Sequence, residues 1–284
     1  MQSYQFYLDR FITQALAEDL GDGDHTSLAT IPEGKQGKAR LLVKEEGVLA
    51  GVEIALAIFK KVDPELQIAN FLKDGERVKY GDIVLYVTGS IYSILVAERL
   101  VLNTMQRMSG IATTTRRITD LLKDTGTKVL DTRKTTPNLR FLEKEAVKIG
   151  GGVNHRFGLY DMILIKDNHV DYAGGIKKAI EAAKNYLREK DKTLMIEIEV
   201  RNLTELEEVL SCEAVDRILL DNFNFETLRE AVQLISGRFV TEASGGITEF
   251  NILEYAKCGV DYISMGALTH SVKSLDLSLK ATEV

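Results

Sequence analysis

The stretch "TLMIEIEV", residues 193–200, decides the fold. Successive side chains of a strand point to opposite faces, so Ile196, Ile198 and Val200 share one face while Glu197 and Glu199 share the other. The apolar face suits packing beneath helices, which leaves the two carboxylates facing the interior of a barrel near its mouth. This stretch therefore predicts one strand of a parallel β/α barrel.

Comparable apolar runs recur on both sides of this stretch, and each is followed by a helix-like segment. They end at Asp131, Lys166, Glu199, Asp221, Glu242 and Gly266. The last four ends are spaced by 22, 21 and 24 residues, which is the length of a strand, a loop and a helix. Such a repeat indicates a parallel sheet with right-handed crossovers. Six units, with room for a further strand near residues 152–153, fit a complete or incomplete barrel, and a doubly wound open sheet is the alternative.

The first part of the chain has a different pattern. Residues 1–90 combine an opening helix with short strand-like runs separated by Gly and Pro turns, which predicts a small α+β domain. From Ser93 to about Asp124, apolar residues recur at the spacings of three and four that are typical of a helix. We expect Ser109-Gly110 to divide this run into two helices. Arg99 lies almost opposite the apolar face, where a solvated surface arginine is the ordinary interpretation.

The composition is that of an ordinary soluble globular protein, with 45% apolar and 27% charged residues. A net charge of −6 argues against nucleic-acid binding, which normally needs a basic excess, and no apolar run is long enough to span a bilayer. The N-terminus has an amphipathic helix pattern rather than that of a signal peptide. Cys212 and Cys258 lack metal-ligand spacing. We therefore expect a cytoplasmic protein with two reduced thiols that binds neither nucleic acid nor membrane.

Polar residues at several successive strand ends indicate a catalytic mouth, because active sites of such barrels lie on the C-terminal face. Glycine turns follow the last two strands, in "EASGGITE" at 242–249 and "SMGALTHS" at 264–271. Glycines let backbone N–H groups approach an anion at a helix N-terminus, and the loops after the last two barrel strands are the usual phosphate site. These turns predict a ligand that carries phosphate.

Cations are concentrated between residues 131 and 169. Three of them are spaced by four residues and are assigned to a solvated helix face: Arg140, Lys144 and Lys148. The others lie at strand ends or in Gly-rich loops: Arg133, Lys134, His155, Arg156 and Lys166. Because the arginine fork binds carboxylate or phosphate at two points, this second group predicts a small polyanionic substrate. Glu199 and Asp221, opposite it, would hold a metal ion or stabilise a developing cation.

Seven ordered blocks of sequence give the chain a resemblance to a known family. They are "DTRKTTP", "GGVNHR", "IKDNH", "IEIEV", "LLDNF", "EASGGI" and "ISMGAL". In this order they resemble quinolinate phosphoribosyltransferase, the decarboxylating enzyme of de novo NAD synthesis, from about residue 15 to residue 280. The resemblance implies an N-terminal α+β sandwich domain at 1–108, completed by about 270–284. It also implies an incomplete parallel β/α barrel as the catalytic domain at 109–269.

The resemblance implies a reaction and a set of site residues as well. The family enzyme joins quinolinate to phosphoribosyl pyrophosphate with Mg2+, giving nicotinate mononucleotide, pyrophosphate and CO2. The groups that would bind the quinolinate carboxylates are Arg133, His155, Arg156 and Lys166, with Arg99 from the neighbouring subunit of a homodimer or higher homo-oligomer. The catalytic residues would be Lys134, Glu199 and Asp221, which also bind phosphoribosyl pyrophosphate, the two acids holding the metal directly or through water. The 5-phosphate would be cradled by Ser244, Gly245, Gly246 and Gly266.

Other functions fit parts of this pattern. A related phosphoribosyltransferase that acts on another ring acid without decarboxylation would keep the phosphate turns and need fewer cations. Lys134 or Lys166 would form a Schiff base in an aldolase-like barrel. A non-catalytic ligand-binding barrel is the third alternative, although it would have no need of the complete set of charges.

Overall fold

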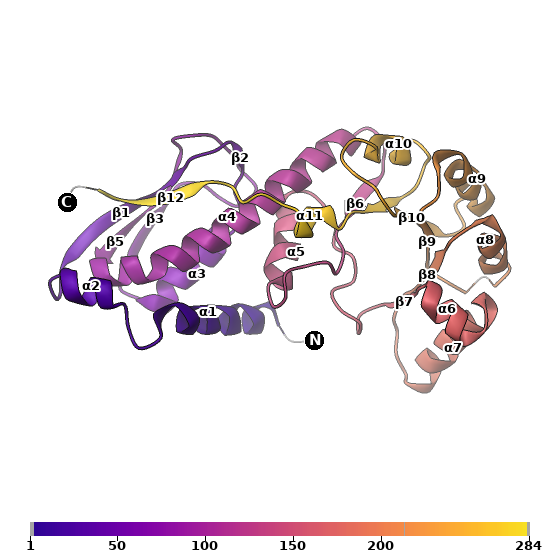
Figure 1. Ribbon diagram of the computed structural model, residues 1–284, viewed down its shortest axis with the longest axis horizontal. Coiled ribbons are helices and arrows are strands. Elements are labelled where there is room, and N and C mark those ends of the chain that lie inside the picture. The colour runs from indigo at the N-terminus through magenta and orange to yellow at the C-terminus, as the bar shows by residue number, and fades with distance from the viewer. Residues whose placement is uncertain (1–2, 213, 283–284) are drawn as a thin grey trace. The chain divides into compact units, whose positions relative to one another are not determined.

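The computed structural model describes residues 3–212 and 214–282. The chain forms two compact units, and it passes between them more than once (Figure 1). The first unit contains Met1–Arg116, Thr135–Gly151 and Leu268–Val284. The second contains Arg117–Lys134 and Gly152–Ala267.

The first unit is built on a four-stranded antiparallel sheet with the order β12-β1-β5-β3. Its strands are β1 (Gln36–Val43), β3 (Gln67–Asn70), β5 (Ile83–Ser90) and β12 (Leu277–Thr282), and a separate ladder joins β2 (Gly47–Val48) to β4 (Arg77–Val78). Its helices are α1 (Tyr4–Leu20), α2 (His25–Thr30), α3 (Val52–Val62), most of α4 (Ile91–Leu122), α5 (Arg140–Ile149) and α11 (Ala267–His270). The register pairs Leu41 with Leu279, so the last strand of the chain lies beside the first.

Alternation along the strands places the apolar core of this unit on one face of the sheet. In β1, Leu41 and Val43 are completely buried, and in α3 so are Ile58 and Phe59. Figure 1 shows α3 and α4 lying along the same face of the sheet. Each such side chain contributes roughly 1.5–3 kcal/mol when it is fully buried, so this packing supplies much of the stability of the unit.

The helix that was expected to break at Ser109-Gly110 is continuous, so that prediction is wrong. α4 runs for 32 residues. The Ser109 hydroxyl accepts from the backbone N–H of Ala50 at 2.9 Å and donates to its carbonyl at 3.1 Å. A Cβ atom on Gly110 would lie 2.2 Å from the carbonyl oxygen of Lys273. The small residues therefore allow close packing of backbone against the helix, and the packing outweighs the roughly 1 kcal/mol by which glycine disfavours a helix.

The second unit is built on a six-stranded parallel sheet with the order β6-β11-β10-β9-β8-β7. Its strands are β6 (Lys128–Leu130), β7 (Ile163–Ile165), β8 (Ile196–Val200), β9 (Arg217–Asp221), β10 (Val240–Ser244) and β11 (Tyr262–Ser264). Its helices are α6 (Asp167–Ala173), α7 (Ile176–Glu189), α8 (Leu203–Leu210), α9 (Phe225–Ile235) and α10 (Ile252–Ala256). Figure 1 shows α8 and α9 on the outer side of β8 and β9.

This sheet is an incomplete barrel, as the family resemblance implies. The first strand, β6, pairs with the last, β11, which curls the sheet toward closure. On the other side of β6, Leu130 forms a parallel bridge with Val153, at the further strand expected near residues 152–153. Within the described residues no strand pairing joins β7 to this segment, so the barrel is open there. From β7 to β11 the strands lie side by side in chain order, and β11 then pairs with β6. A doubly wound sheet would instead reverse its strand order near the middle, so that alternative is excluded.

The solvated face expected for Arg140, Lys144 and Lys148 is wrong at Lys144. These residues do lie at four-residue spacing on α5, and Lys148 is exposed. Lys144, however, is 2% exposed. Spacing identifies residues that share a face of a helix, but the surrounding tertiary structure decides whether that face meets water.

Two expectations from composition can be compared with the structure. Both cysteines are free thiols, Cys258 buried and Cys212 partly so, as predicted. None of the described helices combines the length and the apolar character needed to cross a membrane.

Candidate active site

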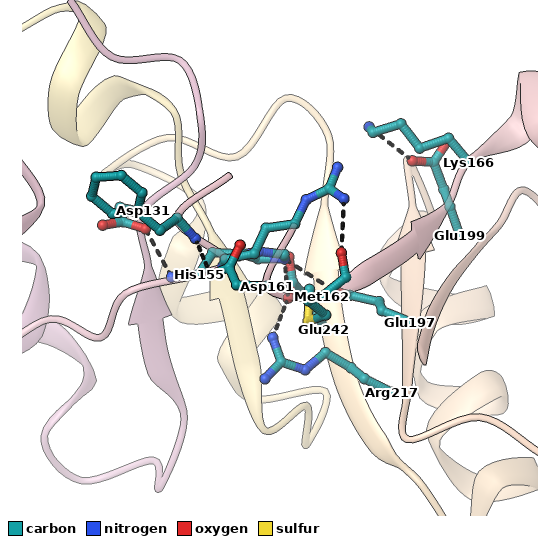
Figure 2. A network of polar contacts seen from close by, with 11 residues as sticks. Asp131, His155, Asp161, Met162, Lys166, Glu197, Glu199, Arg217 and Glu242 are labelled. Atoms are coloured by element: carbon teal, nitrogen blue, oxygen red, sulfur yellow. Dashed lines mark hydrogen bonds and ion pairs between the residues drawn. The ribbon is translucent and has the colours of Figure 1, made fainter. Parts of the chain in front are cut away.

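Charged side chains gather at the carboxyl ends of the barrel strands. Lys166 follows β7 as the N-cap of α6, and Glu199 lies near the end of β8. The Nζ atom of Lys166 is 3.3 Å from Oε2 of Glu199, in an ion pair whose lysine side chain is 49% exposed and whose glutamate is 9% exposed (Figure 2). The lysine end of this pair is open to solvent, so the Lys166 ammonium can contact a bound anion as well as Glu199.

Asp221 ends the next strand, β9, and is half-buried. Burial raises the pKa of its carboxyl group, against the opposing effects of a hydrogen bond from Nδ2 of Asn222 at 2.5 Å and the positive charges of Lys166 and Lys134. The structure thus brings both lysines within electrostatic range of Asp221. Because burial disfavours the charged form of a carboxyl group, a further cation beside Asp221 would stabilise that form.

A loop anchored at two points carries His155 and Arg156. The backbone N–H of His155 donates to Oδ1 of Asp131 at 2.8 Å. Beyond Arg156, Asp161 accepts from two successive backbone N–H groups at 2.6 and 2.8 Å. Figure 2 shows the two aspartates on either side of this segment. These hydrogen bonds to carboxylates fix the backbone from which the side chains of His155 and Arg156 extend.

Two guanidinium groups of the mouth lie close enough to repel one another. Burial and the positive charge of Arg133 both lower the pKa of Arg156. Arg156 donates from Nη1 to the carbonyl of Met162 at 3.2 Å, and Arg133 is exposed. Like charges held together in this way are stabilised by an anion between them, so the geometry favours binding of a carboxylate or phosphate.

A buried ion network fills the barrel interior below the mouth. Nε2 of His155 lies 3.0 Å from Oε2 of Glu197 and 3.4 Å from Oε2 of Glu242. Nη1 of Arg217 lies 3.0 Å from the same oxygen of Glu242 (Figure 2). The His155 side chain is 7% exposed, and both carboxylates are almost completely buried. Two cationic side chains therefore face two buried carboxylates.

The carboxylates set the protonation and the orientation of His155. Burial lowers the pKa of His155, but Glu197 and Glu242 outweigh it and raise the pKa to about 9. Nδ1 of His155 lies 2.7 Å from the backbone nitrogen of Arg156, and Nε2 is the ring nitrogen that faces the two carboxylates. Burial raises the pKa of Glu197. Burial also acts to raise the pKa of Glu242, but the hydrogen bond and the charge of His155 outweigh it and lower that pKa. His155 is thus fixed in position.

The same cluster offers ligand atoms for a metal ion, because single oxygen or nitrogen atoms of His155, Glu197 and Glu242 lie within 4.8 Å of one another. Arg217 and the Nε2 proton of His155 already face these carboxylates. A cation would have to displace both groups, so the cluster is a structural ion network rather than a metal centre. Sequence reasoning missed it because Glu242 was expected to end its strand, whereas β10 continues to Ser244 and places Glu242 deeper inside the barrel.

The glycine turn after β10 has a conformation that only glycine adopts easily. Gly245 and Gly246 have φ of 97° and 60°. A Cβ atom on Gly245 would lie 2.2 Å from Oδ1 of Asn222. The turn does not lead directly into a helix, because α10 begins only at Ile252. Asn222 thus fills the space beside Gly245, whereas the space beside Gly246 is open. Gly266 follows β11, directly before α11.

The remaining site residues divide between the two units. Lys134 is exposed, and its backbone N–H donates to Oγ1 of Thr132 at 3.1 Å in the loop after β6. Arg99 is exposed on α4 in the first unit. The second unit therefore brings together every predicted site residue except Arg99. Their individual roles stay predictions.

Fold and site together define an enzyme of the β/α-barrel class, with a charged catalytic mouth and glycine turns suited to phosphate. Comparison with known proteins then identifies the family. Residues 111–280 match the family model described as the quinolinate phosphoribosyl transferase C-terminal domain, and residues 24–109 match the N-terminal domain of the same family. The chain belongs to the quinolinate phosphoribosyltransferase family.

Individual relatives agree with this assignment. The chain is 46% identical over 281 residues to quinolinate phosphoribosyltransferase [decarboxylating] 2a, mitochondrial, of Nicotiana tabacum, covering 94% of this chain and 80% of the relative. It is 42% identical over 275 residues to a probable nicotinate-nucleotide pyrophosphorylase [carboxylating] of Bacillus subtilis, covering 97% and 93%. The crystal structure of NadC from Streptococcus pyogenes matches with a TM-score of 0.92 and 42% identity over all of both chains.

The buried network predicts a large stability effect at Arg217. Arg217→Ala should lower the free energy of unfolding by about 3 kcal/mol, because it leaves the buried carboxylate of Glu242 without its guanidinium partner. Arg201 provides a matched control: it pairs with Asp171 and Glu205 on the surface, and Arg201→Ala should cost at most about 1 kcal/mol. Urea unfolding followed by circular dichroism measures both. Equal losses in the two variants would contradict the assignment of the network as a buried, mutually dependent cluster.

Proposed function

We propose that this protein transfers the phosphoribosyl group of phosphoribosyl pyrophosphate to quinolinate and removes one carboxylate. The products are nicotinate mononucleotide, pyrophosphate and CO2, as in de novo NAD biosynthesis. One observation carries the proposal beyond family membership: cationic side chains and carboxylates meet at the carboxyl ends of adjacent barrel strands, where Lys166 pairs with Glu199. A substrate with two carboxylates and a reaction with a cationic transition state need both charges in one place.

Quinolinate is a pyridine with adjacent carboxylates, and the cationic side of the mouth suits it. We assign carboxylate binding to Arg133, Arg156 and Lys166, together with His155. Arg133 and Arg156 repel one another, and the half-exposed side chain of Lys166 is accessible to the substrate. His155 is held by Glu197 and Glu242, so it would contact quinolinate through the edge of the ring that those acids leave open.

Transfer occurs at the anomeric carbon of the sugar. The pyridine nitrogen attacks this carbon as pyrophosphate leaves, so positive charge develops on the sugar and negative charge on the leaving group. Glu199 and Asp221, on neighbouring strands, lie where they can bind the ribose hydroxyls and stabilise the oxocarbenium-like charge. Lys134, within electrostatic range of Asp221, would neutralise the pyrophosphate.

Glu199 and Asp221 also fit Mg2+, because hard carboxylate oxygens and substrate phosphates are its usual ligands. These two acids would hold the ion directly or through water, and the ion would supply further positive charge to the pyrophosphate. Asp221 suits this role, since burial raises its pKa and a nearby cation offsets the cost of its charge. Ser244, Gly245, Gly246 and Gly266 would cradle the 5-phosphate with backbone N–H groups, and no side chain at a glycine would obstruct it.

Decarboxylation follows from the first step. Once the ring nitrogen carries the ribose it is cationic, and it can stabilise the carbanion that remains when the adjacent carboxylate leaves as CO2. The protein then needs to orient the carboxylate and exclude water more than it needs a dedicated acid or base. The Schiff-base alternative has no comparable support, because the Nζ of Lys166 is paired with a carboxylate whereas Schiff-base formation needs an uncharged amine.

We further propose a homodimer or higher homo-oligomer in which Arg99 enters the site of the neighbouring subunit. Arg99 is exposed on α4, while Val101, Met105 and Met108 on the same helix are buried. It therefore points away from the core that its helix packs against. The cytoplasmic location expected from the sequence stays a prediction, and the names of several plant relatives place them in mitochondria or chloroplasts.

A single incubation tests the proposed reaction. With quinolinate, phosphoribosyl pyrophosphate and Mg2+, the protein should release CO2 in a one-to-one ratio with nicotinate mononucleotide. Nicotinic acid should be a poor substrate, because it leaves one carboxylate-binding group unpaired in a desolvated site. Nucleotide formation can be followed by ultraviolet absorbance and CO2 by trapping. Comparable turnover of nicotinic acid and quinolinate would show instead a phosphoribosyltransferase that does not decarboxylate.

Subunit hybrids test the role of Arg99. Arg99→Ala and Lys134→Ala homo-oligomers should each be nearly inactive. After dissociation and mixing, a site can combine an intact Lys134 from one chain with an intact Arg99 from the other. By the symmetry of a shared interface, activity should recover to about half of wild type for fully mixed pairs or about a quarter for random pairing. Full activity of Arg99→Ala alone, or inactive hybrids whose formation has been verified, would make Arg99 an ordinary surface residue.

A further inference from the structure

A mostly buried ion pair in the first unit lies outside the site described above. Arg107 of α4 donates from Nε and Nη2 to Oε1 of Glu143 on α5, at 3.1 and 2.8 Å. The Glu143 side chain is 1% exposed and that of Arg107 is 26% exposed. A buried carboxylate such as that of Glu143 is costly unless its partner and further hydrogen bonds satisfy it.

Glu143 holds the start of the segment that follows the loop of Lys134. The backbone N–H of Thr136 donates to Oε2 of Glu143 at 3.0 Å, and the Thr136 hydroxyl donates to Oε1 at 2.8 Å. Thr136 is two residues beyond Lys134, at the point where the chain re-enters the first unit. Both carboxylate oxygens are therefore used to fix this segment.

Arg107 contacts the second segment with which the chain returns to the first unit, the one that begins at Leu268. Its Nη2 donates to the carbonyl of Thr269 in a short contact, and its Nη1 donates to the carbonyl of Val272 at 3.3 Å. Thr269 is completely buried, and it lies three residues beyond Gly266. One guanidinium group thus connects the segment after Gly266 to the same carboxylate that holds the segment after Lys134.

We propose that Arg107 and Glu143 are positioning residues for the phosphoribosyl pyrophosphate subsite. The inference rests on the proposed function, which gives Lys134 and Gly266 to that substrate. Neither Arg107 nor Glu143 touches the reacting groups; they fix the ends of the two loops that carry those residues. Stability alone would not require this arrangement, since well-packed apolar residues often replace a buried ion pair without loss. A planar fork with several acceptors, however, fixes both the distance and the direction of the segments that it joins.

This role predicts a selective kinetic defect. Displacement of a catalytic group by about 1 Å can cost on the order of a hundredfold in rate, and here it would affect the residues assigned to the pyrophosphate and the 5-phosphate. Most of the groups assigned to quinolinate lie elsewhere in the chain, on the loop of His155 and Arg156 and at the end of β7. Quinolinate binding should therefore change little when the ion pair is altered.

Two variants test the proposal. Arg107→Lys keeps the charge but loses the fork, and Thr136→Val removes the hydroxyl donor at an exposed position while keeping the backbone N–H. Each should raise the KM for phosphoribosyl pyrophosphate or lower kcat at least about tenfold, the effect of losing one charge-assisted hydrogen bond. The dissociation constant of quinolinate, measured by calorimetry, should stay within about threefold of wild type. Arg188→Lys and Thr30→Val, at exposed helix positions, are the matched controls and should behave as wild type.

The outcomes separate this proposal from the function on which it rests. A wild-type protein that forms no nucleotide from the two substrates would overturn both. An active wild type with folded variants that keep wild-type kinetics would overturn the positioning role alone, and so would variants that lose affinity for both substrates equally. Melting curves establish that the variants are folded. If Arg107→Lys does not fold, Thr136→Val decides the question, because its side chain is exposed.

Discussion

Parallel pairing of strands from β6 to β11 is the constraint on which the site depends. Every strand points the same way, so residues that end different strands meet at one edge of the sheet. Lys166 and Glu199 lie 33 residues apart in the chain, yet their charged atoms come within 3.3 Å. No local motif could achieve this. The barrel converts a repeat of about 22 residues into a ring of charged groups, with the helices outside supplying the apolar packing that holds it.

Strand periodicity then separates the charges into two layers. Glu197 and Glu199 are two residues apart on β8, so both face the interior, one above the other. The deeper layer, in which Glu197 and Glu242 meet His155 and Arg217, is buried and internally neutralised. The upper layer is partly open, because the side chain of Lys166 is half-exposed. A fixed lower layer allows the upper one to carry charge for substrates, because each of the two carboxylates in the lower layer faces a cationic side chain.

Sequence reasoning predicted the features that depend on period and succession. Alternation in residues 193–200 and the repeated strand ends gave the barrel and the position of its mouth. Features that depend on tertiary packing were not predicted. Ser109 and Gly110 look like a helix break until Ala50 and the backbone of Lys273 are seen against them. The burial of Lys144 likewise depends on what covers α5. The pairing of β12 with β1 was expected only from the family resemblance, since β-pairing between the two ends of a chain leaves no local signal.

The central claim is a division of labour in the mouth: cations bind quinolinate, and carboxylates act on the sugar as charge develops. Calorimetric titration of quinolinate into Arg156→Ala and Glu199→Ala tests it most directly. Arg156→Ala should weaken binding at least about tenfold, the effect of losing a charge-assisted hydrogen bond. Glu199→Ala should bind quinolinate within about threefold of wild type, because its loss frees Lys166 for the substrate, although turnover should fall steeply. Normal quinolinate binding by Arg156→Ala, together with loss of binding in Glu199→Ala, would contradict the account.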